Sequence, residues 1–188
     1  MSLLFKVTNV LSKLEEPRTP YSYRTHKKIY NLPGQYFHCD LADMSVFNTD
    51  KKVYRRNYCI VLVDGVSGFV RFKASIGKSA REILVALKSL FEHMNRQEEV
   101  FLQTDRGGEF YNKQFEAWCN ENKITHFSSK NLQKAYLAEN AIRRLKDIYQ
   151  KLRIAKKLTD KTDWTSFLPL VEEKLNKSKR TVSGITPE

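Results

Sequence analysis

Three acidic residues, Asp40, Asp105 and Glu139, stand where carboxylates could hold divalent metal ions. Phosphodiester chemistry with two metals needs acidic ligands fixed on rigid elements, around ions about 4 Å apart. Three carboxylates held close together repel one another and resist ionisation unless a cation neutralises them. Ligands that are all oxygen atoms favour Mg²⁺ or Mn²⁺. The sequence therefore suggests a site for two such ions, provided that the fold brings the three acids together.

Asp40 interrupts an otherwise apolar segment that we predict to be a strand. Because side chains alternate along a strand, Cys39 and Leu41 should face one way, and His38, Asp40 and Ala42 the other. An aspartate inside a central strand is costly unless it is paired or bound to a metal. The alternative is an edge strand whose polar face lies in water.

Asp105 directly follows a predicted buried strand, Val100 to Thr104. Sheets of α/β proteins place their functional sites at the carboxyl ends of strands. Gly107 and Gly108 allow the backbone to turn sharply or to approach a substrate closely. An aspartate that only joins a strand to a turn would give the same pattern, and the local sequence does not decide between the two.

Glu139 lies early in a long predicted helix, Ala135 to Lys157. At about 100° per residue, one side of this helix carries an apolar stripe, and Glu139 stands at its margin. The stripe consists of Ala138, Ala141, Leu145, Ile148 and Leu152. Glu139 is in line with Arg143, Lys146 and Gln150, so basic residues follow it along the helix. This placement suits a metal site next to a DNA-binding ridge. A surface ion pair between Glu139 and Arg143, worth a few tenths of a kcal/mol, is the better interpretation when Glu139 is taken alone.

The positive charge of the chain is concentrated in one segment. Of the net +12 over 188 residues, +8 falls on residues 123–161, where eleven Lys and Arg face three acids. Phosphate contacts dominate nucleic-acid affinity, so a local basic excess favours a nucleic-acid partner over a solvated basic helix without one. Within it, Lys130, Lys134, Arg143, Lys146 and Lys151 are the residues that we expect to position phosphates without reading sequence.

Several other classes of protein are disfavoured. The three cysteines form no Cys-x-x-Cys pair, which argues against a disulfide framework and a zinc finger. The longest apolar run, Tyr58 to Val63, is too short to span a bilayer.

The order of predicted elements is that of a mixed α/β domain. A turn at Leu32-Pro33-Gly34 separates a basic N-terminal extension, residues 1–31, from the core, residues 32–188. We predict strands at Gln35–Met44, Asn57–Val63, Phe69–Ser75, Val100–Thr104 and Ile124–Phe127. Helices should start at a capping box, Ser79 to Glu82, and at Asn112, followed by the long helix and by a helical segment, Asp163–Asn176, that Pro169 starts or interrupts.

Four strings of residues carry more specific information. They are Asp40-Leu41-Ala42-Asp43-Met44, Leu102-Gln103-Thr104-Asp105-Arg106-Gly107-Gly108-Glu109-Phe110-Tyr111-Asn112, Ile124-Thr125-His126-Phe127-Ser128-Ser129, and Lys134-Ala135-Tyr136-Leu137-Ala138-Glu139 leading to Arg143-Arg144-Leu145-Lys146. Jointly they resemble the catalytic core of retroviral-type integrases, and more closely that of the integrases of self-synthesising Maverick/Polinton transposons. The resemblance covers residues 35–188.

The resemblance implies an RNase H-like fold, with a mixed five-stranded sheet flanked by helices. It implies that Asp40, Asp105 and Glu139 are the catalytic triad, holding two Mg²⁺ or Mn²⁺ ions for 3′-end processing and for joining that end to target DNA. It also implies that the partners are transposon ends and target DNA, that the protein is a homodimer or higher multimer, and that it acts in the nucleus. Asp43 and Asp64 are then structural, and Glu109 stabilises a turn.

Two departures from the family pattern bear on these expectations. Asp105 and Glu139 are separated by 33 residues, slightly fewer than is usual in retroviral integrases. Asn140 stands where the transposon relatives commonly have Arg, which weakens the case for a phosphate contact there. Two other functions stay open: an RNase H-type nuclease, and a domesticated, inactive nucleic-acid-binding module.

Overall fold

The computed structural model describes residues 32–47, 56–128, 136–155, 163–178 and 187. The predicted N-terminal extension, residues 1–31, therefore lies outside the described residues. Within them, the five predicted strands are present, each within two residues of its predicted bounds: β1 (Tyr36–Asp43), β2 (Tyr58–Asp64), β3 (Val70–Ser75), β4 (Val100–Gln103) and β5 (Ile124–Phe127).

The strands form one mixed sheet in the order β3-β2-β1-β4-β5. β1 is antiparallel to β2 and parallel to β4, β2 is antiparallel to β3, and β4 is parallel to β5. The predicted mixed five-stranded sheet is confirmed. Because β1 has a paired neighbour on each side, Asp40 lies in the central strand, and the alternative of a wet edge strand is wrong.

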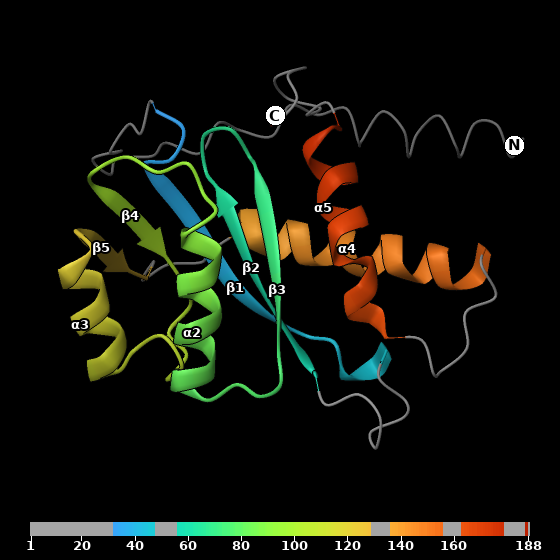
Figure 1. Ribbon diagram of the computed structural model, residues 1–188, viewed down its shortest axis with the longest axis horizontal. Coiled ribbons are helices and arrows are strands. Elements are labelled where there is room, and N and C mark those ends of the chain that lie inside the picture. The colour runs from blue at the N-terminus through green and yellow to red at the C-terminus, as the bar shows by residue number, and fades with distance from the viewer. Residues whose placement is uncertain (1–31, 48–55, 129–135, 156–162, 179–186, 188) are drawn as a thin grey trace, which may run out of the picture.

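Helices cover both faces of this sheet (Figure 1). On one face, α2 (Ala80–Phe91) and α3 (Lys113–Glu121) pack on a cluster that includes Phe37, Cys39 and Leu102. On the other face, α4 (Tyr136–Ala155) and α5 (Leu168–Asn176) pack on a cluster that includes Ala42 and Val61. The alternation predicted for β1 is thus confirmed, and Asp40 belongs to the face that α4 covers.

Local sequence signals account for where these helices begin. The capping box at Ser79 is present, with the Ser79 side chain accepting from the backbone of Glu82 and the Glu82 side chain accepting from Ser79. Asn112 caps α3 through a hydrogen bond from Phe115 N, and a proline occupies the first turn of α5. The short 3-10 helix η2 (Trp164–Phe167) precedes α5, so Pro169 starts a helix rather than breaking one.

The buried stripe of α4 differs from its predicted composition. Ala138, Ala141 and Leu145 are buried, but the last buried position is Tyr149. Leu152, which was predicted to continue the stripe, is only partly covered. The rings of Tyr149 and Phe47 lie 4.8 Å apart, so the short helix η1 (Ser45–Phe47) determines which side chain closes the core here.

Candidate active site

The strand register brings Asp40 and Asp105 to neighbouring positions. In the parallel pair of β1 and β4, Phe37 lies beside Leu102 and His38 beside Gln103. The pairing stops there because β4 ends at Gln103, and Asp40 and Asp105 each follow this last pair by two residues in the same direction. Asp105 therefore follows the carboxyl end of β4, where α/β sheets place their sites, and Asp40 lies within the adjacent strand β1, beyond its last residue paired with β4.

The buried thiol of Cys39 responds to the charges of both carboxylates. Burial raises the pKa of the Cys39 thiol well above its usual value, and the negative charges of Asp40 and Asp105 raise it further. Both carboxylates are thus within electrostatic range of this thiol. Asp40 is half-buried, whereas Asp105 is exposed.

The segment that carries Asp105 is held by its neighbours. The Thr104 hydroxyl donates to the carbonyl of Asp105 at 2.7 Å and lies 2.8 Å from His126 Nε2. Since the hydroxyl has one proton, this arrangement assigns the proton between Thr104 and His126 to Nε2. Burial lowers the pKa of His126 to about 4, which keeps its ring neutral. Gly107 N donates to Asp105 Oδ1 at 3.1 Å.

Glu139 lies in the first turn of α4, the helix that packs on the face of β1 that carries Asp40. Helix α4 packs against β1 and β2, and Ala138, next to Glu139, is fully buried in the cluster that contains Ala42 of β1. One turn earlier, the Tyr136 ring contacts the ring of His38, two residues before Asp40. Glu139 itself is exposed.

The three carboxylates lie on β1, after β4 and on the helix that packs on β1, but they are not gathered as ligands. Among the residues that the structure describes, no group of three or more His, Cys, Asp or Glu is arranged to hold a metal ion. The donor set still suits a hard cation, because all its atoms are carboxylate oxygens. Glu139 and Asp105 are exposed, so rotation of their side chains would not disturb the core. The triad and its metals stay a prediction.

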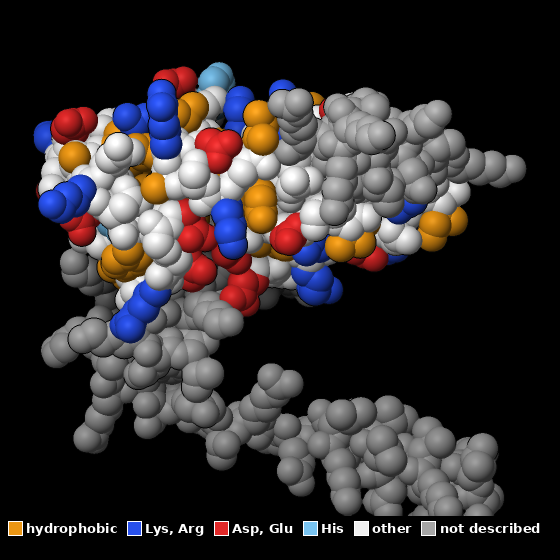
Figure 2. All heavy atoms as spheres, turned by 90° about the horizontal axis from the view of Figure 1, so that it is seen from below, with side chains coloured by type: hydrophobic (Ala, Val, Ile, Leu, Met, Phe, Trp, Pro, Cys, Tyr) orange, Lys and Arg blue, Asp and Glu red, His pale blue; other side chains and the backbone are white. Residues whose placement is uncertain are grey.

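Acidic side chains are conspicuous on one face of the molecule. Figure 2 shows several Asp and Glu side chains near the middle of the face seen from below in Figure 1, with Lys and Arg side chains around them. A mixture of this kind can hold cations and phosphates side by side.

The basic residues predicted to contact DNA have different surroundings. Arg143 donates to Asn140 Oδ1 at 2.8 Å, so its guanidinium points toward the start of α4. Lys146 lies near Asp43: hydrogen bonds from Ser45 lower the pKa of that carboxyl, and the charge of Lys146 lowers it further. Lys151 forms an ion pair with Asp147 at 2.8 Å. Lys130 and Lys134 lie outside the described residues.

Asp64, predicted to be structural, is tied down by backbone donors. It is buried and accepts from Gly34 N at 2.7 Å and from Val66 N at 2.8 Å. These bonds fix the turn between β2 and β3 to the residue that precedes β1. Asp43 likewise accepts from Ser45 N at 2.8 Å, as expected of a residue that ends a strand.

The sequence analysis assigned no role to Tyr136, although its spacing from Glu139 gives a signal. Residues three apart lie side by side on a helix, so an exposed tyrosine at this distance from a candidate ligand belongs to the same surface. The structure adds its contact with buried His38, whose Nδ1 has no hydrogen-bond partner among the described residues. Burial lowers the pKa of His38 to about 4.

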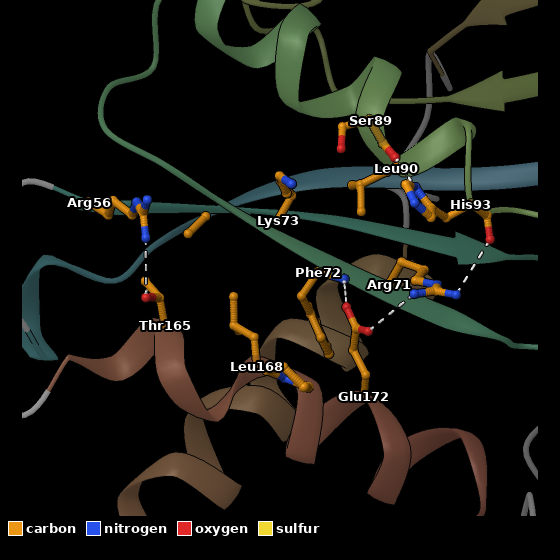
Figure 3. Close-up of a pocket in the computed structure, with 12 residues that line it drawn as sticks. Arg56, Arg71, Phe72, Lys73, Ser89, Leu90, His93, Thr165, Leu168 and Glu172 are labelled. Atoms are coloured by element: carbon orange, nitrogen blue, oxygen red, sulfur yellow. Dashed lines mark hydrogen bonds and ion pairs between the residues drawn. The ribbon is translucent and has the colours of Figure 1, made fainter.

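A hollow of about 400 Å³ lies away from the carboxylates, at the β3 edge of the sheet (Figure 3). Its lining includes Arg56, Arg71, Lys73, His93, Thr165 and Glu172. In Figure 3, β3 crosses between α2 and α5, and Glu172 reaches from α5 to both Phe72 N and Arg71. No predicted ligand lines this hollow, so we do not place the chemistry there.

The architecture matches that of integrase catalytic cores. Over 83% of this chain and 95% of the other, it superposes on the HTLV-2 integrase catalytic core domain in complex with magnesium, with a TM-score of 0.63 at 18% identity. The catalytic core domain of BIV integrase gives a TM-score of 0.61 at 21% identity over 82% and 91% of the two chains. This is the RNase H-like fold that the resemblance implied.

A longer relative gives a TM-score of 0.70 at 19% identity: a chain of the simian T-cell lymphotropic virus intasome in complex with PP2A regulatory subunit B56 gamma. The match covers 87% of this chain and 56% of that chain, so this chain spans little more than half of that relative's length. No curated protein sequence matches the chain.

Sequence comparison identifies the family. The family model described as Integrase core domain matches residues 31–131, which is more than half of the chain. The protein therefore belongs to the integrase core domain family. The matched segment contains Asp40 and Asp105 and ends before Glu139, so the third acid rests on the fold and on the local sequence. None of the described helices has the length and apolar character needed to cross a membrane.

Proposed function

We propose that this chain is the catalytic core of a transposon integrase, a polynucleotidyl transferase that processes DNA 3′ ends and joins them to target DNA. The observation that supports the proposal most is the parallel pairing of β1, which carries Asp40, with β4, which Asp105 follows by two residues, together with the packing of α4 on β1. Family membership supports the polynucleotidyl transferase class. The motifs around Asp40, Asp105 and Glu139 support the Maverick/Polinton type in particular.

In this proposal Asp40, Asp105 and Glu139 hold two Mg²⁺ or Mn²⁺ ions. When bound, such ions activate the attacking oxygen and stabilise the leaving oxygen of an in-line displacement. The chain's own contribution is placement. Thr104 and His126 fix the backbone at Asp105, and burial of Ala138 against the sheet fixes the helix that carries Glu139.

The basic residues of α4 support DNA as the partner in this proposal. Arg143 and Lys146 lie within two turns of Glu139 on α4, and Lys146 is close enough to Asp43 at the end of β1 to lower its pKa. In this proposal they hold the phosphates on either side of the bond that reacts at the carboxylates. We further propose that the protein acts on paired ends as a homodimer or higher multimer, and that it works in the nucleus.

A strand-transfer assay tests the proposal. Duplexes with a recessed 3′ end are incubated with the full chain, a supercoiled plasmid and Mg²⁺ or Mn²⁺. Joined products are expected from the wild type, and none from Asp105→Asn. Cleavage without joining would favour the RNase H-type nuclease instead. DNA binding without either product would favour the inactive binding module. That alternative is supported by the finding that no three acidic, His or Cys side chains of the described residues are grouped to hold a metal ion.

Metal binding can be tested apart from catalysis. Titration with Mn²⁺ should raise the thermal unfolding midpoint of the wild type, because a ligand that binds only the folded state stabilises it. The rise should disappear in Asp40→Asn. An equal rise in both proteins would place the metal elsewhere and contradict the assignment of Asp40 as a ligand.

A further inference from the structure

Tyr136, the first residue of α4, carries an aromatic ring that is largely open to solvent. In the described part of the chain the two exposed aromatic side chains are Tyr136, at 61%, and Tyr111, at 42%. Burying an aromatic side chain is among the larger favourable contributions to folding. An exposed ring on rigid secondary structure beside a candidate active site is therefore available to a ligand.

A row of aromatic rings, of which His38 is buried, lies next to the Tyr136 ring. The Tyr136 ring packs edge to face on His38, with ring centroids 5.4 Å apart, and His38 is only 2% exposed. His38 in turn contacts Tyr36 at 4.7 Å, and Tyr36 stacks on Phe127 at 6.2 Å. The Tyr36 hydroxyl donates to Gln103 Oε1. This row of rings crosses from β5 to the start of α4 and holds Tyr136 in place, so little side-chain entropy remains to be lost on binding.

The position of Tyr136 indicates what it would bind. It lies three residues before Glu139, so both side chains occupy neighbouring positions on α4. Arg143, four residues beyond Glu139, donates to Asn140 and so points back toward the same end of the helix. An aromatic face, a carboxylate and a guanidinium follow one another along about 10 Å of helix. A nucleotide offers the matching sequence of groups: a base, then phosphates.

We propose that Tyr136 is a stacking platform for an unpaired nucleobase next to the phosphodiester that meets the candidate carboxylates. This inference rests on the proposed function for the identity of the polyanion. An unpaired base is required, because a base within a duplex is already stacked on both faces. Every base has a π face, so stacking on Tyr136 should tolerate any base at that position.

Binding of a fluorescent base tests this inference without catalysis. A duplex with 2-aminopurine at its unpaired 3′ terminus is titrated with the full chain in the absence of divalent metal. We expect the wild type and Tyr136→Phe to quench the fluorescence. Tyr136→Ala should lose the quenching and bind about tenfold more weakly, within the range for loss of one base-aromatic stack. Quenching by Tyr136→Ala equal to that of the wild type would overturn the inference.

Tyr111 provides a matched control on the opposite face of the sheet. Its ring also packs on a histidine, His126, at 4.7 Å, and it is also exposed. His126 contacts Phe115 of α3, so Tyr111 lies on the α3 side of the sheet, away from α4. Tyr111→Ala should quench and bind as the wild type does. A loss of quenching in Tyr111→Ala equal to that in Tyr136→Ala would show a general effect of removing exposed tyrosines and would overturn the inference.

A second variant covers the case in which Tyr136→Ala does not fold. Tyr136→Leu keeps an apolar cover over His38 but has no π face, so it should fold and still lose the quenching; retained quenching would overturn the inference. The strand-transfer assay is scored separately. If the wild type forms no joined product but quenches the fluorescence, and the Tyr136 variants do not, the proposed function is wrong while stacking on Tyr136 is supported. If it forms joined product and Tyr136→Leu quenches fully, the platform alone fails.

Discussion

Acidic side chains have different roles in two regions of this molecule, the β3 edge of the sheet and the turn that follows β4. At the β3 edge, Glu172 is partly buried, accepts from Phe72 N at 2.6 Å and lies 3.7 Å from Arg71. At the carboxyl ends of β1 and β4, Asp105 is exposed and accepts from the backbone of Gly107 at 3.1 Å, within its own turn. An acid that holds the fold together is buried against donors from distant elements. An acid on a rigid strand end that remains accessible is available for a ligand.

The β3 edge is closed by side chains from α5. Asn176 is buried, accepts from Val70 N at 2.8 Å and donates to Val70 O at 3.0 Å, so one amide replaces a neighbouring strand. Unpaired edges invite other strands, and covering them is a common protection. The β3 edge is thus closed by a buried amide, whereas Asp105 at the candidate site stays accessible to solvent.

The largest expected effect is on catalysis at the open site. Asp105→Asn should reduce strand transfer by about a thousandfold or more, because the amide keeps the shape but loses the charge that a cation needs. The free energy of unfolding should change by less than about 0.5 kcal/mol, as is usual for exposed positions. Product yield and urea unfolding measure the two quantities.

Glu109 supplies the control for Asp105. It lies in the same turn and Glu109→Gln also removes one negative charge, but we predict a turn-stabilising role for it. Equal losses of strand transfer in Asp105→Asn and Glu109→Gln would show a general charge effect, and the special role of Asp105 would have to be abandoned.

The next effect is on stability at the closed edge. Asn176→Ala should lower the free energy of unfolding by about 2–4 kcal/mol, since it removes two hydrogen bonds and leaves the backbone groups of Val70 buried without partners. Asn120→Ala, at an exposed position of α3, should be nearly neutral. Urea denaturation of the two variants measures their free energies of unfolding. An unchanged value for Asn176→Ala would mean that water replaces the amide at Val70 and that Asn176 does not close the β3 edge.

The sequence predicts the elements well where the signals are local. The capping box at Ser79 and the cap at Asn112 depend on residues three apart, and strand alternation placed Asp40 on its observed face. The sequence cannot predict contacts between distant segments. Asn176 and Val70 are 106 residues apart, and no short-range pattern indicates that they bond.

The candidate site shows the same limit. Local pattern indicated Asp40 but left Asp105 undecided and Glu139 disfavoured. What relates the first two is the β1–β4 register, and what relates the third is the packing of α4 on β1. Both are tertiary facts. The choice of Tyr149 over Leu152 in the core arose in the same way, because Phe47 meets Tyr149.

The stability of the protein should depend on pH through His126, the side chain that bonds to Thr104 next to Asp105. Burial lowers the pKa of His126 to about 4, below its usual value of 6.5. The folded state therefore binds fewer protons than the unfolded state between these values. The stability due to a neutral His126 is complete above about pH 6.5 and is lost as the pH falls toward 4. Because the ring is partly exposed and its charge is screened by solvent, the loss should be at most on the order of 2 kcal/mol.

His126→Gln should flatten this pH dependence of unfolding, measured by urea titrations between pH 7.5 and 4.5. A residual slope is expected from His38, whose pKa burial also lowers to about 4. His93 is exposed, so His93→Gln should keep the full slope. If His126→Gln keeps it as well, then His126 is not the neutral support of the Asp105 turn.

The smallest effect tests how far the DNA-binding surface extends along α4. Lys151 and Asp147 form an exposed i,i+4 pair at 2.8 Å, and such pairs contribute only a few tenths of a kcal/mol. Lys151→Ala should therefore leave stability unchanged within that margin. If Lys151 contacts a phosphate, the slope of log affinity against log salt concentration should fall in magnitude by about 0.9.

Arg143→Ala is the comparison, because Arg143 lies closer to Glu139 and bonds to Asn140 instead of to an acid. Its salt slope should fall by the same amount, and its strand-transfer yield should fall too, since a phosphate held beside the carboxylates positions the reacting bond. Lys151→Ala should change affinity without changing the yield at saturating DNA. Unchanged salt slopes in both variants would mean that these residues of α4 do not contact DNA phosphates. The proposed path of DNA along α4 to the candidate site would then be wrong.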